Sequence, residues 1–87
     1  MARIFSIEFT FNNASEHAMI AVRKTAFYTE YKIALQSPEI TELLLSDKII
    51  SPQPGVFLFA NVSKGEYNEA MKQILAAVAG HVHSLHH

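Results

Sequence analysis

The residues of this chain with the clearest capacity for chemistry are the histidines near its end, because four of the five lie in residues 81–87. If a helix runs through Gly80, His83 and His87 stand four residues apart on one face, a spacing that can hold Zn²⁺ or Ni²⁺. Chain ends usually fray, however, and Gly80 stands where a helix often ends. We therefore interpret residues 81–87 as a frayed, solvated tail in which His83 and His87 are weak metal-ligand candidates, and we expect no cofactor.

The same segment carries an apolar pattern that offers a second interpretation. Val82 and Leu85 continue a helical stripe that begins at Tyr67 and Met71. If the helix extends past Gly80, its end projects beyond the core of a short chain and needs a second apolar surface. This pattern favours a dimer contact through Val82 and Leu85, and the sequence leaves open whether the helix extends that far.

The other groups that could perform catalysis have structural explanations. We interpret His17, which stands alone beside Glu16, as a strand or turn residue on a partly exposed face rather than as a general base. The chain has no cysteine, and therefore no thiolate nucleophile, disulfide or cysteine-based zinc site. It also lacks a glycine-rich phosphate loop and a nucleophile elbow. Two carboxylate pairs fall in the first turns of expected helices, where they stabilise the helix dipole: Glu39 with Glu42, and Glu66 with Glu69. We leave enzymatic activity open and favour its absence.

Composition limits the partners that we expect. Seven basic and eight acidic residues give a net charge of −1, and neither sign forms a block, which argues against nucleic acid or an anionic membrane as a partner. No apolar run approaches the ~20 residues that span a bilayer, and the first segment alternates instead of forming a signal peptide. We therefore expect a cytoplasmic protein. With 49% apolar and only 17% charged residues in one domain over residues 1–87, the chain favours a homodimer or a protein partner.

The first part of the chain, residues 3–35, is predicted to form strands. In residues 3–11 apolar side chains alternate with polar ones, which predicts a half-buried strand, and Asn12 and Asn13 then supply turn chemistry. Residues 13–24 also alternate, although Asn13 and Glu16 fit a helix cap as well, so strand and helix both stay open here. Residues 27–35 alternate again, with Phe27 on the face assigned to the core. We favour a three-stranded antiparallel meander.

The second half of the sequence predicts two helices and a strand between them. Ser37 and Pro38 begin a short helix that ends near Asp47. Residues 49–50 can form a brief strand before the turn at residues 52–55. The unbroken apolar run over residues 56–60 predicts a strand that is central in the sheet or lies against a partner. Ser63 and Glu66 match a capping box, which predicts the start of a long amphipathic helix.

The order β-β-β-α-β-α predicts an α+β, two-layer sandwich, with a mainly antiparallel sheet and helices packed on one face. A mixed sheet surface and the end of the last helix are the expected interaction surface: Met19, Arg23, Tyr28, Val82 and Leu85. The leading hypothesis is a small, non-catalytic protein-interaction or self-associating, homodimeric module. The alternative is a small-ligand-binding or minor enzymatic domain with a cleft near the turns at 52–55 and 61–63, where we would watch four polar groups: Tyr31, Asn61, Ser63 and Tyr67.

Overall fold

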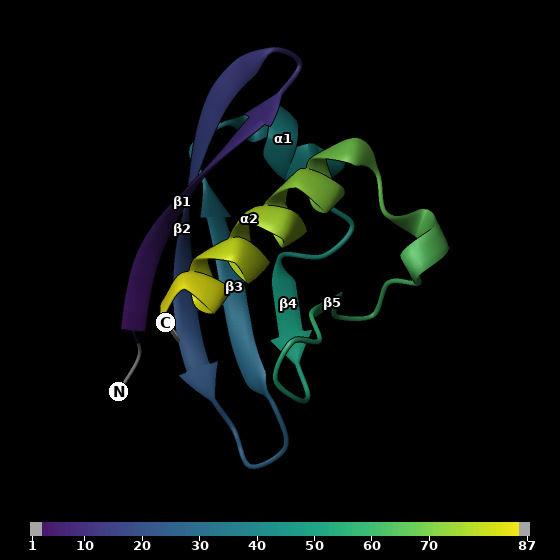
Figure 1. The fold of residues 1–87 in the computed structure, drawn as a ribbon. Helices are drawn as coiled ribbons and strands as arrows, with labels where there is room; N and C mark the ends of the chain where they lie inside the picture. Colours follow the sequence, from purple (N-terminus) through teal and green to yellow (C-terminus); the bar gives the residue numbers. More distant parts are fainter. Residues whose placement is uncertain (1–2, 86–87) are drawn as a thin grey trace.

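One antiparallel sheet of five strands, in the order β1-β2-β3-β4-β5, forms one layer of the computed structural model, which describes the backbone of residues 3–85 and the side chains of residues 3–83 (Figure 1). A long helix forms the second layer. This arrangement confirms the predicted α+β class. In chain order the elements are β1 (Arg3–Phe11), β2 (Ala14–Lys24), β3 (Thr29–Leu35), α1 (Pro38–Leu43), β4 (Lys48–Ser51), β5 (Leu58–Phe59), the 3₁₀ helix η1 (Lys64–Glu66) and α2 (Glu69–Leu85).

The first three strands form the predicted meander, so residues 14–24 are strand and not helix. A two-residue loop joins β1 to β2, because Phe11 pairs with Ala14 across it. Asn12 and Asn13 have φ angles of 52° and 63°, the left-handed values that a hairpin turn of this length requires. Asparagine tolerates this conformation better than most residues, which is why the turn falls here.

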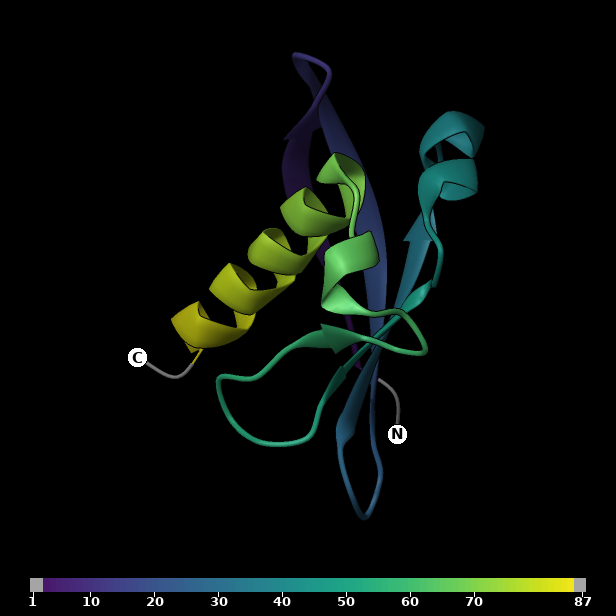
Figure 2. The same cartoon turned by 90° about the vertical axis from the view of Figure 1, so that its right-hand side faces the viewer.

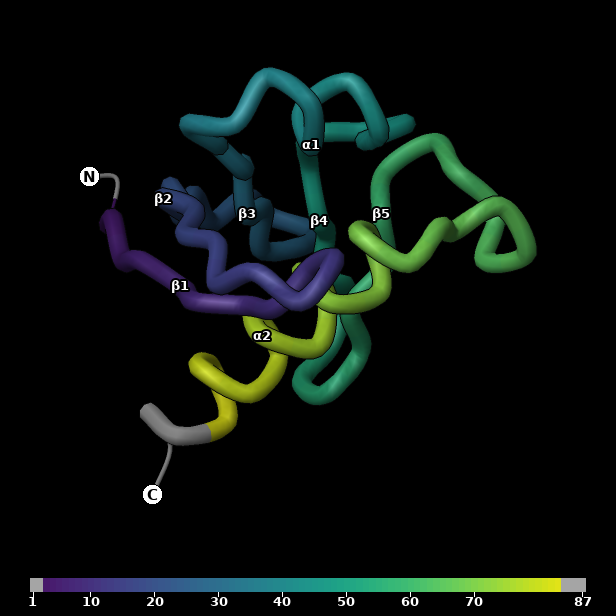
Figure 3. Tube along the Cα trace, turned by 90° about the horizontal axis from the view of Figure 1, so that it is seen from above, coloured from purple at the N-terminus to yellow at the C-terminus, as the bar shows by residue number. Residues whose placement is uncertain are grey.

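The core lies between the sheet and α2, which runs across one face (Figure 3). Met71, Ile74 and Val78 recur along one side of α2, and all three are fully buried. They meet inward-facing side chains of the strands, such as Ile20 and Ile49, which are also fully buried. The short helix α1 lies beyond the end of β3 and touches both β3 and α2, with only its Ile40 buried.

The apolar run over residues 56–60 is not a central strand. Only Leu58–Phe59 are strand, at the edge of the sheet beyond β4. Phe59 is buried because the ring of Tyr67 stands edge-on against it, and the Tyr67 hydroxyl accepts a hydrogen bond of 2.8 Å from the Phe59 backbone N–H. Phe57 instead packs near Tyr31. The run is apolar because separate partners cover its rings, and not because sheet flanks it on both sides.

The long helix begins later than the sequence predicts. Ser63 starts the 3₁₀ helix η1 without a side-chain capping bond, and α2 begins only at Glu69. Asn68 caps α2, since its side-chain oxygen accepts a 3.0 Å hydrogen bond from the Met71 backbone N–H, while its amide donates to the Leu43 carbonyl at 2.7 Å. At its other end, α2 continues through Gly80 to Leu85.

The prediction that Phe27 faces the core is wrong. Phe27 is 84% exposed at the tip of the loop between β2 and β3. The Thr25 hydroxyl accepts hydrogen bonds from the backbone N–H groups of Phe27 and Tyr28 and donates one to the Tyr28 carbonyl. These bonds close a turn over residues 25–28, and the alternation of the strand therefore starts only at Thr29.

Candidate functional site

The sheet presents one face to α2, and on the other side, among the described helices, only the short helix α1 stands, beyond the end of β3 (Figure 2). Strand alternation and register assign the side chains of this second face, which we call the open face. Met19, which is 50% exposed, lies on β2 with the small Ala21 and Ala34 as neighbours, and Ile4, which is 65% exposed, lies on the edge strand β1. The members of the open face are Ile4, Ser6, Glu8, Thr10, Ser15, His17, Met19, Ala21, Arg23, Glu30, Lys32, Ala34, Lys48, Ile50 and Leu58.

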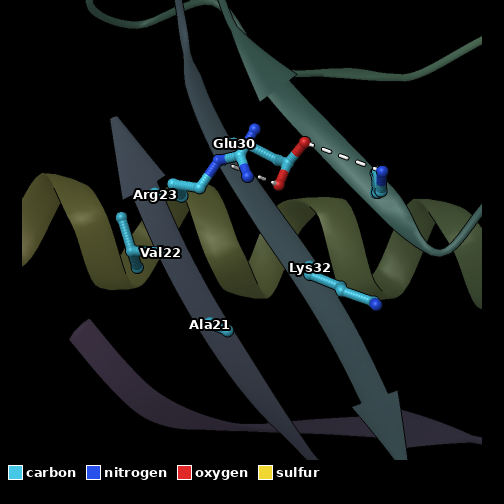
Figure 4. Close-up of a pocket in the computed structure, with 6 residues that line it drawn as sticks. Ala21, Val22, Arg23, Glu30 and Lys32 are labelled. Atoms are coloured by element: carbon cyan, nitrogen blue, oxygen red, sulfur yellow. Dashed lines mark ion pairs between the residues drawn. The ribbon is translucent and has the colours of Figure 1, made fainter. Parts of the chain in front are cut away.

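Charged side chains lie around Met19 on the open face. Glu30 forms ion pairs with Arg23, at 4.0 Å, and with Lys48, at 3.8 Å, over a small hollow (Figure 4). Lys32 is the direct cross-strand neighbour of Lys48, which places two cations side by side. At the other end of the face, Glu8 lies 3.8 Å from His17. The open face therefore has a basic end around Lys32 and Lys48 and an acidic group, Glu8, beyond Met19.

A groove opens on the opposite side of the sheet. α2 stands farther from the sheet toward its C-terminal end, and the loop between β4 and β5 extends beside it (Figure 2). The groove between them has a volume of about 1020 Å³, at the upper limit of the range for small-molecule sites. The loop between β2 and β3 forms its lower end, where exposed Phe27 is a lining residue.

Four aromatic rings follow one another along the floor of the groove. The His81 ring stacks on Phe5, with centroids 4.0 Å apart and planes at 4°. Phe5 meets Tyr31 edge-on at 6.4 Å, and Tyr31 meets Phe57 at 5.9 Å. These residues come from α2, β1, β3 and the loop before β5, so the floor exists only in the folded chain.

The charges along the groove have one sign. Arg3 and Lys24 line it, together with His81 and His83, and no aspartate or glutamate is among the described residues that line it. Burial raises the pKa of the Tyr31 hydroxyl above its usual value of 10.0, and the nearby Arg3 lowers this pKa by a smaller amount. The groove therefore combines an aromatic floor with a positive potential.

Tyr31 makes stability depend on alkaline pH in a defined direction. Its raised pKa in the folded state contributes stability that is fully present below pH 10.0 and is lost as pH rises through the folded-state pKa, because the unfolded chain releases this proton first. We expect the urea midpoint of the wild type to fall more steeply between pH 9 and pH 11 than that of Tyr31→Phe. Equal slopes for Tyr31→Phe and wild type would contradict the assignment.

The residues predicted for interaction are divided between the two surfaces. Met19 and Arg23 lie on the open face, whereas Tyr28 and Val82 line the groove. Tyr28 belongs to the turn before β3 and not to the sheet surface. The backbone of Leu85 ends α2, and its side chain is outside the described part of the structure.

The groove includes one of the two turns predicted for the cleft. Residues 52–55 and Tyr31 line the groove, but residues 61–63 and Tyr67 do not. Within residues 3–85, no group of three or more histidine, aspartate or glutamate side chains is arranged to hold a metal ion. His87 lies outside the described residues, so its pairing with His83 stays a prediction.

Several groove residues were not singled out from the sequence as site residues, among them Arg3, Lys24, Phe27 and Phe57. Arg3 and Lys24 stand at strand ends, where isolated basic residues are common, and Phe57 belonged to the run predicted as a central strand. Phe27 could have been found, because Thr25 two residues earlier is a turn-forming residue that can detach an aromatic side chain from the strand pattern.

Comparisons with protein-family models, with curated proteins and with solved structures found no match to this chain. None of the helices within residues 3–85 is long and apolar enough to cross a membrane. The evidence on function therefore comes from the open face and the groove.

Proposed function

We propose that this protein is a self-associating module, and that two copies pack through their open faces. The observation that carries the proposal is the exposure of Ile4 and Met19 on the open face. Large exposed apolar side chains with polar groups around them are typical of protein interfaces. The neighbours Ala21 and Ala34 are small, which lets a second sheet approach closely.

The size of the open face suits a weak dimer. The five strands have 9, 11, 7, 4 and 2 residues, which at about 3.4 Å per residue and about 4.8 Å between strands give a projected area of about 540 Å². Two copies would then bury about 1000 Å², which is the lower limit of a specific interface. We expect a dissociation constant of about 1–100 μM, because interfaces of this size are usually transient.

The charges of the open face also fit a second copy. Along β2, Met19 lies between His17, which pairs with Glu8, and Ala21, which pairs with Lys32. In a face-to-face dimer the two-fold axis lies between the two sheets and parallel to them. When this axis passes over Met19 and runs diagonally to the strands, it places the Glu8 end of one copy against the Lys32 end of the other. Glu8 of one copy then faces Lys32 and Lys48 of the other, with the strands of the two sheets crossing at a large angle, as in orthogonal sheet packing.

Sedimentation velocity between 1 and 200 μM tests the proposal. We expect the wild type to change from monomer to dimer over this range, and Glu8→Lys and the double variant Lys32→Glu, Lys48→Glu each to weaken association severalfold. An equimolar mixture of the two variants should recover association, because each then supplies the charge that the other lacks. A wild type that stays monomeric at 200 μM, or a mixture that associates no better than either variant alone, would contradict the proposal.

A further inference from the structure

The groove is electrostatically unlike the rest of the chain. The sequence has eight acidic and seven basic residues, yet the described residues that line the groove include Arg3 and Lys24 and none of the acidic ones. His81 and His83 add groups that can only be neutral or positive. A cavity with one sign of charge and apolar walls raises the local concentration of ligands of the opposite sign.

The aromatic floor sets a second requirement for the occupant. Phe5, Tyr31 and Phe57 line the groove from three different segments, and Val22 and Val82 line it as well. His81 is stacked on Phe5, and Tyr31 is only 6% exposed between Phe5 and Phe57. Aromatic rings prefer offset or edge-to-face partners at centroid distances of about 4.5–7 Å, so a planar ring system is favoured over a flexible polar chain. Phe27 lines the open end of the groove and is 84% exposed there, so its ring is available to an aromatic ligand.

We propose that the groove binds a small aromatic anion, with its rings against Phe5, Tyr31 and Phe57 and its carboxylate or sulfonate group toward Arg3 and Lys24. The ligand class follows from charge complementarity together with the row of rings. The proposal does not depend on self-association, because the groove lies on the α2 side of the sheet and Met19 on the other, although Ile4 at the edge strand β1 also lines the groove.

Two fluorescent probes that share one ring system test the two requirements separately. 8-Anilinonaphthalene-1-sulfonate carries the negative charge, and N-phenyl-1-naphthylamine is the same ring system without it. In fluorescence titrations of the folded protein at low salt, we expect one site per chain for the sulfonate and about 2- to 30-fold weaker binding of the neutral probe, the range for one or two exposed charge pairs. Added salt should reduce this difference.

Variants locate the site. Arg3→Gln combined with Lys24→Gln should weaken the sulfonate to about the affinity of the neutral probe. The matched control is Lys64→Gln combined with Lys72→Gln, which removes the same charge from exposed positions outside both the groove and the open face and should leave binding unchanged. Phe27→Ala should weaken both probes, and at 84% exposure the Phe27 ring can be removed without loss of folding.

Amide chemical shifts give a readout that does not depend on fluorescence. We expect the sulfonate to shift the amides of Tyr28, Phe57 and Val82 and to leave that of Ala34 in place. Equal affinity for both probes, an unchanged affinity in the Arg3→Gln, Lys24→Gln variant, or shifts centred on the open face would each overturn the proposal.

Discussion

Replacing Ile74 by alanine should lower the free energy of unfolding by about 2–5 kcal/mol, because the side chain is fully buried at the centre of α2 and its loss leaves a cavity. A chain of 87 residues has a total stability of about 4–13 kcal/mol, so this one change removes a large fraction of it. Urea unfolding followed by circular dichroism measures the effect. All variants should be compared at one protein concentration, since a dimer makes apparent stability concentration-dependent.

Lys72→Ala is the matched control for Ile74→Ala. It shortens a long side chain on the same helix, but Lys72 is exposed and alanine is an equally good helix former, so we expect a change within about 0.5 kcal/mol. If Ile74→Ala cost less than about 1 kcal/mol, α2 would not be the element that closes the core, and the groove beside it would lose its wall.

The three-stranded meander and the buried face of α2 could be predicted because the spacing of apolar residues along the sequence indicates them directly. Phe5 to Phe11 alternate with polar residues, and β1 has one face toward a helix and one face toward water. Met71, Ile74 and Val78 repeat at helical spacing for the same reason, and all three are buried. Where one face of a strand or helix is buried and the other is exposed to solvent, the spacing of apolar residues follows burial and the prediction is correct.

The prediction failed where tertiary partners, rather than neighbours along the chain, decide burial. Residues 56–60 are uniformly apolar, yet Phe57 and Phe59 are covered by Tyr31 and Tyr67 from distant segments. The capping pattern at Ser63 competed with Asn68, which wins because its amide also reaches the Leu43 carbonyl and ties α2 to the end of α1. Neither partner can be seen in a local window of sequence.

The groove could not be predicted because it depends on an angle between elements. Phe5 has the spacing of a core residue, whereas Val82 was predicted as a dimer contact and Tyr31 as a group near a cleft, so the sequence did not bring the three together. They line a groove because the last turns of α2 stand away from the sheet, as Figure 2 shows, so that the sheet continues past the helix that covers it. The open face, in contrast, could be predicted in part, because the alternation of side chains along β2 placed Met19 and Arg23 on the same face of the sheet.

Met19 is the residue on which self-association should depend most strongly. It is half exposed in a single chain, and in the proposed dimer it lies close to the two-fold axis, where both copies would bury it. Met19→Asp would place two carboxylates next to each other in a desolvated centre without cationic partners. Burying an unpaired charge costs several kcal/mol, so we expect association to weaken more than about 100-fold.

Sedimentation velocity of Met19→Asp at 200 μM should therefore show only monomer, while the circular dichroism spectrum stays that of the wild type, because an exposed strand position tolerates the change at a cost of about 1 kcal/mol or less. Met19→Leu should keep the dimer, since it preserves the apolar volume. Ala26→Asp adds the same charge in the exposed turn between β2 and β3 and should also leave the dimer intact, which separates a local effect from one of net charge. If Met19→Asp associates as the wild type does, the open face is not the surface through which copies meet, and the exposed Ile4 and Met19 side chains need another explanation.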